Sequence, residues 1–203
     1  DTRIEVASTP ELDRMVDHMS QSFRRDDDDA SYLEDGKVSA PVVGRLSELL
    51  PVDVKAVVEE SLTLARYQIK MDRFACTVNA PAEVPKVRGN QNQLQEVFLN
   101  LILNACQAMG EQGGKLDVSL SNANGSSIEV KVADSGPGIP PAKLNKIFDP
   151  FYTTKSTGTG LGLFVSQRII QSHGGVLSVE STVGQGTCFT IKLPALQEAA
   201  APL

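Results

Sequence analysis

The chain carries its strongest helical pattern between residues 91 and 109. At 100° per residue, the apolar side chains of this stretch gather on one broad face, and the amide side chains gather on a separate stripe. The apolar face contains Leu94, Phe98, Leu101, Ile102, Ala105 and Met109, and the polar stripe contains Gln93, Glu96, Asn100, Asn104 and Gln107. A helix this apolar is predicted to be mostly buried. Its amide groups therefore need partners, because an unpaired buried amide costs roughly 1–3 kcal/mol.

Shorter patterns on either side predict the rest of a mixed domain. One helix is expected from about residue 54 to 69 with Asp53 as its N-cap, and another follows the glycines at 158–162. Alternating apolar and polar residues predict strands at 115–121 and 127–133, and further strands are expected at 74–79, 176–181 and 187–193. Hairpins that are separate from the helices in this order indicate an α+β fold, a two-layer sandwich with helices on one face of a mixed sheet.

The first fifty residues differ from the rest of the chain. Residues 10–23 show a narrow helical stripe, as in a helix that packs on another helix or on a partner chain, so a homodimer through this helix is one expectation. The run Asp26–Asp29 is interpreted as a solvated loop, since consecutive carboxylates rarely converge on one metal ion. We therefore divide the chain into an N-terminal helix and linker (1–50), a main domain (51–195) and a frayed tail (196–203).

Composition and charge narrow the class of protein. The chain has 203 residues and a net charge of −6 without a basic stripe, which argues against a nucleic-acid partner. No apolar run approaches the roughly 20 residues of a membrane span, and the N-terminus lacks a signal-peptide pattern. The three cysteines have neither metal nor disulfide spacing, which fits a reducing compartment. These features predict a cytoplasmic location, with any membrane anchor of a longer parent on a segment outside this sequence.

Two glycine clusters provide the candidate chemistry. D-S-G-P-G-I occupies residues 134–139, and G-T-G-L-G-L occupies residues 158–163. Glycine allows a backbone to turn sharply or to approach a ligand closely. The second cluster leads directly into a helix, so free N–H groups and the positive end of the helix dipole face whatever lies in front of it. The expected ligand is an anion, and a phosphate chain is the anion that fits best.

These residues together resemble a known family. From about residue 52 to 194 the chain is similar to the ATP-binding catalytic domain of bacterial sensor histidine kinases, which shares the Bergerat nucleotide fold with gyrase, mismatch-repair and heat-shock chaperone ATPases. Five segments match the family's motifs in order: N-L-I-L-N-A at 100–105, D-S-G-P-G-I at 134–139, F-D-P-F at 148–151, G-T-G-L-G-L at 158–163 and G-Q-G-T-C-F at 184–189. The short lid and the sequence F-Y-T-T-K resemble the nitrogen-regulation branch of the family.

The resemblance implies roles in binding ATP and Mg²⁺. Asp134 is expected to accept a hydrogen bond from the adenine amino group, and Asn104 to give its side-chain oxygen to Mg²⁺. Lys155 is expected to contact phosphate, while Phe148 and Phe151 are expected to anchor the lid, with plain core packing as the alternative. Asn104 and Lys155 are the expected catalytic residues and Asn104 the metal ligand. The expected nucleotide site comprises Asn100, Asn104, Asp134, Gly136, Gly138, Ile139, Phe148, Lys155, Gly158, Thr159, Gly160, Leu161, Gly162, Leu163 and Thr187.

Asn100 separates two kinds of family member. In the hydrolysing relatives, the position four residues before the metal-binding asparagine is a glutamate that activates water, whereas an amide cannot accept that proton. The expected reaction is therefore transfer of the γ-phosphoryl group of ATP to a histidine. The acceptor motif, a histidine followed by an acidic residue and a proline, is missing, and His18 has different neighbours. We therefore expect a fragment that does not autophosphorylate. Its expected partners are a phospho-accepting histidine hairpin of the parent kinase and a response regulator receiver domain.

Two other functions stay open at this point. The first is a degenerate nucleotide-binding module that signals without transfer, which the intact Asn104, Asp134 and glycine clusters disfavour. The second is an ATPase of the same fold, which Asn100 disfavours. The amide pair on its own would also fit a core role in which both side chains cap nearby backbone.

Overall fold

The computed structural model describes residues 49–69, 71–123, 125–155 and 158–196. The helix predicted at 10–23, with His18, and the run Asp26–Asp29 lie outside these described residues. The described residues belong to the second of two compact units, Gly44–Leu203.

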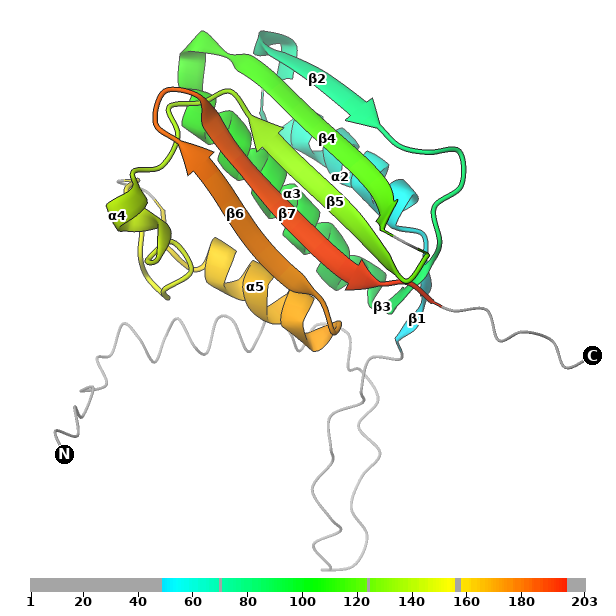
Figure 1. The fold of residues 1–203 in the computed structure, drawn as a ribbon. Coiled ribbons are helices and arrows are strands. Elements are labelled where there is room, and N and C mark those ends of the chain that lie inside the picture. Colours follow the sequence, from blue (N-terminus) through cyan, green and yellow to red (C-terminus); the bar gives the residue numbers. More distant parts are fainter. Residues whose placement is uncertain (1–48, 70, 124, 156–157, 197–203) are drawn as a thin grey trace, which may run out of the picture. The chain divides into compact units, whose positions relative to one another are not determined.

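A five-stranded sheet forms one layer of this unit (Figure 1). Its strands lie in the order β2-β4-β5-β7-β6, and their bounds are Phe74–Asn79 (β2), Gly114–Ala123 (β4), Ser127–Asp134 (β5), Val176–Thr182 (β6) and Gly186–Pro194 (β7). β2 pairs with β4 in parallel, and the other neighbours are antiparallel, so the sheet is mixed. Each of these strands was predicted from the sequence, and pairing with a neighbour extends several of their ends by one or two residues.

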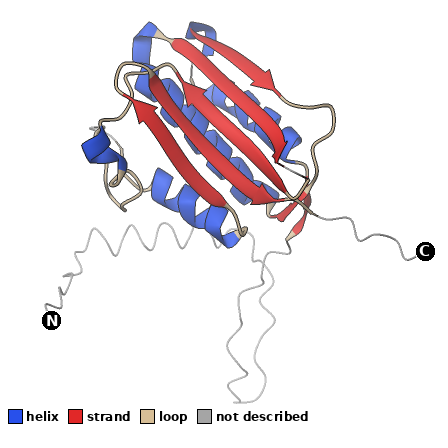
Figure 2. Ribbon diagram, in the orientation of Figure 1, coloured by secondary structure: helices blue, strands red, loops and turns tan. Residues whose placement is uncertain are grey.

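The main helices cover one face of the sheet and form the second layer (Figure 2). They are α2 (Val54–Gln68), α3 (Gln91–Met109) and α5 (Gly162–Ser172). α3 contacts both α2 and α5, and it is the central helix of the layer. The expected α+β two-layer sandwich is therefore confirmed.

Side-chain caps set where the two long helices begin. Asp53 accepts a hydrogen bond from the N–H three residues further on, at 3.2 Å, and so caps α2 as predicted; Asn90 caps α3 in the same way at 3.1 Å. The backbone N–H of Asn90 also donates to Nε2 of the buried His173, at 3.0 Å. Since Nδ1 of His173 lies 2.7 Å from the carbonyl oxygen of Ile169, this ring ties the start of α3 to the end of α5.

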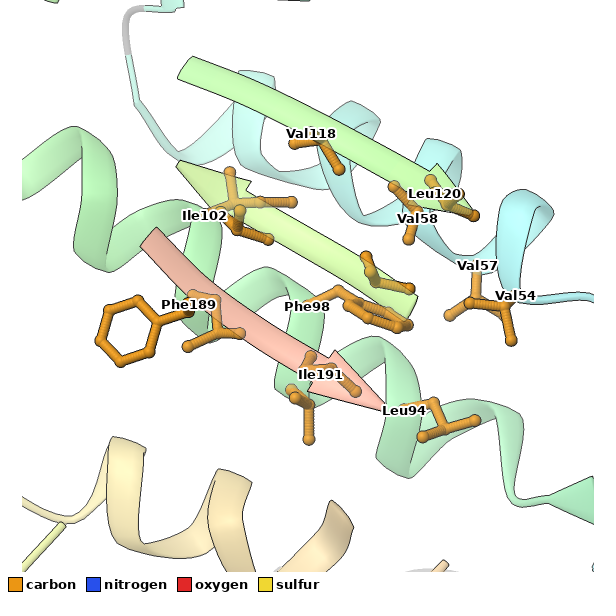
Figure 3. Packing of buried hydrophobic residues seen from close by; sticks show 14 of the residues in the cluster. Val54, Val57, Val58, Leu94, Phe98, Ile102, Val118, Leu120, Phe189 and Ile191 are labelled. Atoms are coloured by element: carbon orange, nitrogen blue, oxygen red, sulfur yellow. The ribbon is translucent and has the colours of Figure 1, made fainter. Parts of the chain in front are cut away.

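The apolar face of α3 fills the space between the two layers (Figure 3). Its side chains Leu94, Phe98 and Ile102 are fully buried, and they belong to one cluster with valines of α2 and inward side chains of β4 and β7. Burial of one side chain of this size contributes roughly 1.5–3 kcal/mol. The prediction that this helix is buried is confirmed, and its burial places the polar stripe of α3 next to α5.

The shortest elements were not predicted. β1 (Leu50–Val52) and β3 (Val87–Gly89) form a two-stranded antiparallel sheet, α4 (Pro141–Leu144) is one helical turn, and η1 (Met71–Arg73) and η2 (Gly110–Gln112) are 3₁₀ turns. Three or four residues are too few to display a period, so tertiary contacts decide their form.

The backbone is still hydrogen-bonded to the rest of the domain at residues 195 and 196, where the frayed tail was predicted to begin. The N–H of Leu196 donates to the carbonyl of Lys86 at 2.6 Å, and Ala195 bridges Val87 in β3. Among the helices of the described residues, none has both the length and the apolar character that crossing a bilayer requires.

Candidate functional site

A cleft of about 550 Å³ lies beside the C-terminal half of α3, between the end of β5, α4, the loop before α5 and the first turn of α5. Most of the predicted site residues line it: Asn100, Asn104, Asp134, Gly138, Ile139, Lys155, Gly158, Thr159, Gly160, Gly162, Leu163 and Thr187. A second cavity of the same volume, at the end of α2, is lined by residues 66–69, 72, 74 and 76 and includes none of them. The first cleft is therefore the candidate site.

The amide stripe of α3 forms a chain of hydrogen bonds at one wall of the cleft. The side-chain N–H of Asn100 donates to the hydroxyl of Ser166 in α5, at 3.0 Å. The side-chain N–H of Asn104 in turn donates to the oxygen of Asn100, at 3.3 Å. Both amides therefore find polar partners, and the oxygen of Asn104 is the acceptor left for the cleft.

Lys155 brings a positive charge to the same wall. Its ammonium donates to the side-chain oxygens of Asn104, at 2.8 Å, and of Gln107, at 2.5 Å. Although the residue as a whole is exposed, burial of its ammonium end lowers the pKa of Lys155. The loop before α5 is thus attached to α3 through a cation and two neutral oxygens.

Asp134 supplies a carboxylate at the end of β5. The residue is only 8% exposed, and this burial raises the pKa of Asp134 above its ordinary value. The N–H groups of Gly136 and Thr187 oppose the rise, and the N–H of Gly136 lies 2.8 Å from the carboxylate. One carboxylate oxygen is therefore held by the backbone where Asp134 lines the cleft.

Hydroxyl groups of the β6–β7 hairpin support this part of the site. The hydroxyl of Ser181 lies 2.9 Å from that of Thr187 and donates to the carbonyl of Gly186 at 2.8 Å. The N–H of Ile139 donates to the same Ser181 oxygen, at 2.8 Å. The first glycine cluster is thereby fixed to the sheet, with Thr187 beside Asp134 in the paired strand.

Two glycines are required by close approach. A Cβ at Gly162 would lie 2.5 Å from the side-chain oxygen of Asn100, so any other residue here would displace that side chain. Gly138 has a φ of +72°, and its Cβ would lie 2.2 Å from the carbonyl oxygen of Thr182. Both positions explain why the predicted glycine clusters flank this cleft.

Other predicted residues lie behind the cleft and do not line it. Gly136 acts through its N–H to Asp134, Leu161 occupies the N-cap position of α5, and Phe148 is half-buried against the core. The expectation that Phe151 anchors the lid in an apolar socket is wrong for this structure, because its side chain is 55% exposed. Its backbone, at φ +66°, instead closes the loop by donating to the carbonyl of Gly160 at 3.1 Å.

Some cleft residues had not been predicted. Gln107, which holds Lys155, lines the cleft together with Lys143 of α4 and Tyr152, whereas Ser166 is 2% exposed and holds Asn100 from behind the wall of the cleft. Gln107 belongs to the amide stripe of α3, which was a usable signal. Ser166 had a weaker signal, as a polar position four residues after Gly162 in an apolar helix.

The donor set limits how a cation could be held. Within the described residues, no group of three or more His, Cys, Asp or Glu side chains converges. The oxygen of Asn104 is a hard, neutral ligand of the kind that Mg²⁺ accepts, but one such oxygen is not a complete site. These residues therefore fit Mg²⁺ only as an ion that takes its other ligands from phosphate oxygens and water.

The chain matches a family of nucleotide-binding proteins in sequence. Residues 89–197 match the family described as histidine kinase-, DNA gyrase B-, and HSP90-like ATPase. Sensor histidine kinase ZraS of Escherichia coli (strain K12) is 38% identical over 146 residues, which are 72% of this chain and 31% of ZraS. Sporulation kinase A of Bacillus subtilis (strain 168) is 38% identical over 143 residues, 70% of this chain and 23% of that kinase. The chain thus spans less than a third of the length of these relatives.

Solved structures of histidine kinases are similar to this chain in fold. The catalytic domain of histidine kinase ThkA, in a nucleotide-free form, has a TM-score of 0.65 and 31% identity, covering 73% of this chain and 96% of that chain. The mycobacterial sensor histidine kinase MprB has a TM-score of 0.65 and 29% identity, covering 72% and 97%. Full-length ShkA in complex with AMPPNP has a TM-score of 0.64 and 28% identity, covering 76% and 32%.

Proposed function

Because the chain belongs to the family of histidine kinase-, DNA gyrase B-, and HSP90-like ATPases, we propose that its cleft binds ATP with Mg²⁺ and presents the γ-phosphoryl group to a histidine on another segment. One observation carries this proposal. A buried carboxylate, Asp134, and the amide oxygen of Asn104 line a single cleft that the glycines before α5 also line. The cleft thus offers separate partners for a base, a phosphate chain and an ion.

The residues divide along the nucleotide. Asp134 is the acceptor for the adenine amino group, and it would meet a carbonyl oxygen if guanine entered, a mismatch of roughly 1–3 kcal/mol. The backbone before α5, including Gly160 and Gly162, lies where a helix N-terminus favours phosphate. Lys155 adds a donor for phosphate oxygens, and its ammonium must leave the oxygen of Asn104 when that oxygen holds Mg²⁺. Mg²⁺, when bound with the nucleotide, would neutralise phosphate charge.

Asn100 decides which reaction this chain supports. Its amide is already committed to Ser166 and Asn104, and it has no group that takes a proton from water. The nucleotide is therefore kept for an imidazole nitrogen, whose bond to the γ-phosphorus forms as the bond to the bridging β–γ oxygen breaks. The proposed partners are a phospho-accepting histidine hairpin of the parent kinase, a response regulator receiver domain, and a second copy of the chain in a dimer.

Calorimetry of the full chain tests nucleotide binding. We expect heat on titration with Mg²⁺ and a non-hydrolysable ATP analogue, and a loss of at least about tenfold in Mg²⁺-dependent affinity in Asn104→Ala. Asn79→Ala is the matched control. It removes an exposed amide at the end of β2 that does not line the cleft. A folded parent chain that releases no heat would overturn the proposal.

A transfer assay separates the three candidate functions. The chain is mixed with labelled ATP, Mg²⁺ and a separate histidine-bearing hairpin from the same parent. Label on the hairpin supports phosphoryl transfer, whereas binding without label on the hairpin supports a signalling module without chemistry. Steady release of free phosphate by the chain alone supports an ATPase, and it would contradict the role given to Asn100.

A further inference from the structure

We propose that Ser166 is a positioning residue that orients the side chain of Asn104 through Asn100, so that an oxygen and not an N–H group faces the cleft. The proposal rests on the proposed function, because it concerns the metal-binding end of the nucleotide site. It adds a residue on α5 that touches neither nucleotide nor ion.

The hydrogen bonds from Ser166 through Asn100 to Asn104, here called the relay, begin where α5 packs on α3. Ser166 is 2% exposed, and its hydroxyl accepts the side-chain N–H of Asn100 at 3.0 Å. The oxygen of the same amide accepts the side-chain N–H of Asn104, at 3.3 Å. The oxygen of Asn104 is then the atom that points to the cleft, where Lys155 donates to it at 2.8 Å.

The direction of the relay is fixed by what each group can donate. The ammonium of Lys155 has donors only, so an oxygen must face it. A reversed Asn100 would place its N–H₂ against the N–H₂ of Asn104, with no acceptor between them. The hydroxyl of Ser166 then accepts the Asn100 N–H, a hydrogen bond that an alanine at this position would not provide. Within the described residues, no buried side-chain nitrogen or oxygen lacks a partner, as a complete relay requires.

The position of Gly162 makes the relay specific to the start of α5. Gly162 and Ser166 are four residues apart in the helix and therefore share one face. That face lies against Asn100 at both positions, since a Cβ at Gly162 would come within 2.5 Å of its oxygen. One helix face thus both closes the phosphate end of the cleft and sets the orientation of the metal-binding amide.

The metal dependence of nucleotide affinity measures the relay. In Ser166→Ala we expect the ratio of affinities for an ATP analogue with and without Mg²⁺ to fall about tenfold, as for other outer partners of metal ligands. Affinity in the presence of a chelator should stay unchanged, since the adenine end is untouched. Ser166→Thr keeps the hydroxyl and should restore most of the ratio. Ser172→Ala, in the same helix but bonded to its own backbone, is the control.

A second measurement needs no nucleotide. Nuclear magnetic resonance of the side-chain amides should show that Ser166→Ala shifts the N–H₂ signals of both Asn100 and Asn104, whereas Ser172→Ala shifts neither. An unchanged Asn104 signal or an unchanged Mg²⁺ ratio in folded Ser166→Ala would overturn the relay. If the parent chain itself binds no nucleotide, the proposed function fails, and the amide signals still decide whether the relay exists.

Discussion

Asp134 is subject to two opposing requirements. Its carboxylate is buried at the end of β5, and burial raises its pKa, while the N–H groups of Gly136 and Thr187 lower it. The proposed recognition of adenine needs the ionised form. The nucleotide-free domain is therefore less stable at neutral pH, because the ionised Asp134 is buried without a ligand to pair with it.

Replacing this carboxylate should separate stability from binding. We expect Asp134→Asn to raise the Tm of the nucleotide-free chain at pH 7 and to weaken ATP binding about tenfold, because a charged acceptor becomes neutral. The native pKa lies above the 3.8 of the unfolded chain, so proton binding stabilises the native state at low pH, and this stabilisation is lost as pH rises through the native pKa. The gain in Tm should therefore shrink as the pH is lowered toward the pKa of the unfolded chain.

Scanning calorimetry at several pH values checks this prediction. Asp72→Asn, at an exposed position in η1, is the control for removal of one negative charge. A gain in Tm that is the same at acid and neutral pH, or that the control reproduces, would contradict the account of Asp134.

At the scale of elements, the site depends on a loop that is held between strands. The segment after β5 runs past the β6–β7 hairpin, and the N–H of Gly184 donates to the carbonyl of Pro137 at 2.8 Å. Gly138 and Gly184 both have left-handed backbones, with φ of +72° and +80°. They differ in surroundings, because a Cβ at Gly138 meets the Thr182 carbonyl, whereas a Cβ at Gly184 has open space.

This pair separates backbone conformation from crowding. Gly184→Ala should lower the free energy of unfolding by roughly 1–2 kcal/mol, the cost of a left-handed alanine. Gly138→Ala should lower it by about 1–3 kcal/mol more, because the new methyl group also displaces the hairpin. Urea unfolding of both variants measures the difference. Equal losses would mean that the loop can move away from the hairpin without cost.

At the scale of the whole unit, the site depends on the place of α3 between α2 and α5 in the helical layer. One face of this helix fills the core, and its polar stripe becomes a wall of the site where α5 packs on it. The same helix therefore carries stability and binding on different faces, which allows the two to be tested by different substitutions.

The core face should determine stability alone. Phe98→Ala should lower the free energy of unfolding by about 3–5 kcal/mol, because it removes a fully buried ring from between the layers. Tyr67→Ala, at a side chain that is 85% exposed on α2, should change it by less than about 0.5 kcal/mol. Urea unfolding of the full chain provides both values, and a small effect of Phe98→Ala would mean that the core is not shared between the layers.

Much of the fold was predictable because it repeats a period over many residues. The bounds of α3 and β2 agree with the sequence prediction, and Asp53 caps α2 as expected. The segments of three or four residues were not predictable, since they have no period. Phe151 was misjudged because an aromatic residue in a motif favours burial, whereas its backbone closes a loop and leaves the ring exposed.

The sequence by itself determined the layers, the motif residues and the polar stripe of α3, because periodicity and glycine placement are local properties of the chain. Only the tertiary structure decided how those amides are oriented. Asn100 meets Ser166 across 66 residues of sequence, and Lys155 reaches Asn104 across 51. Hydrogen bonds between side chains depend on which atoms packing brings within about 3 Å of each other, and no pattern along the chain encodes that distance.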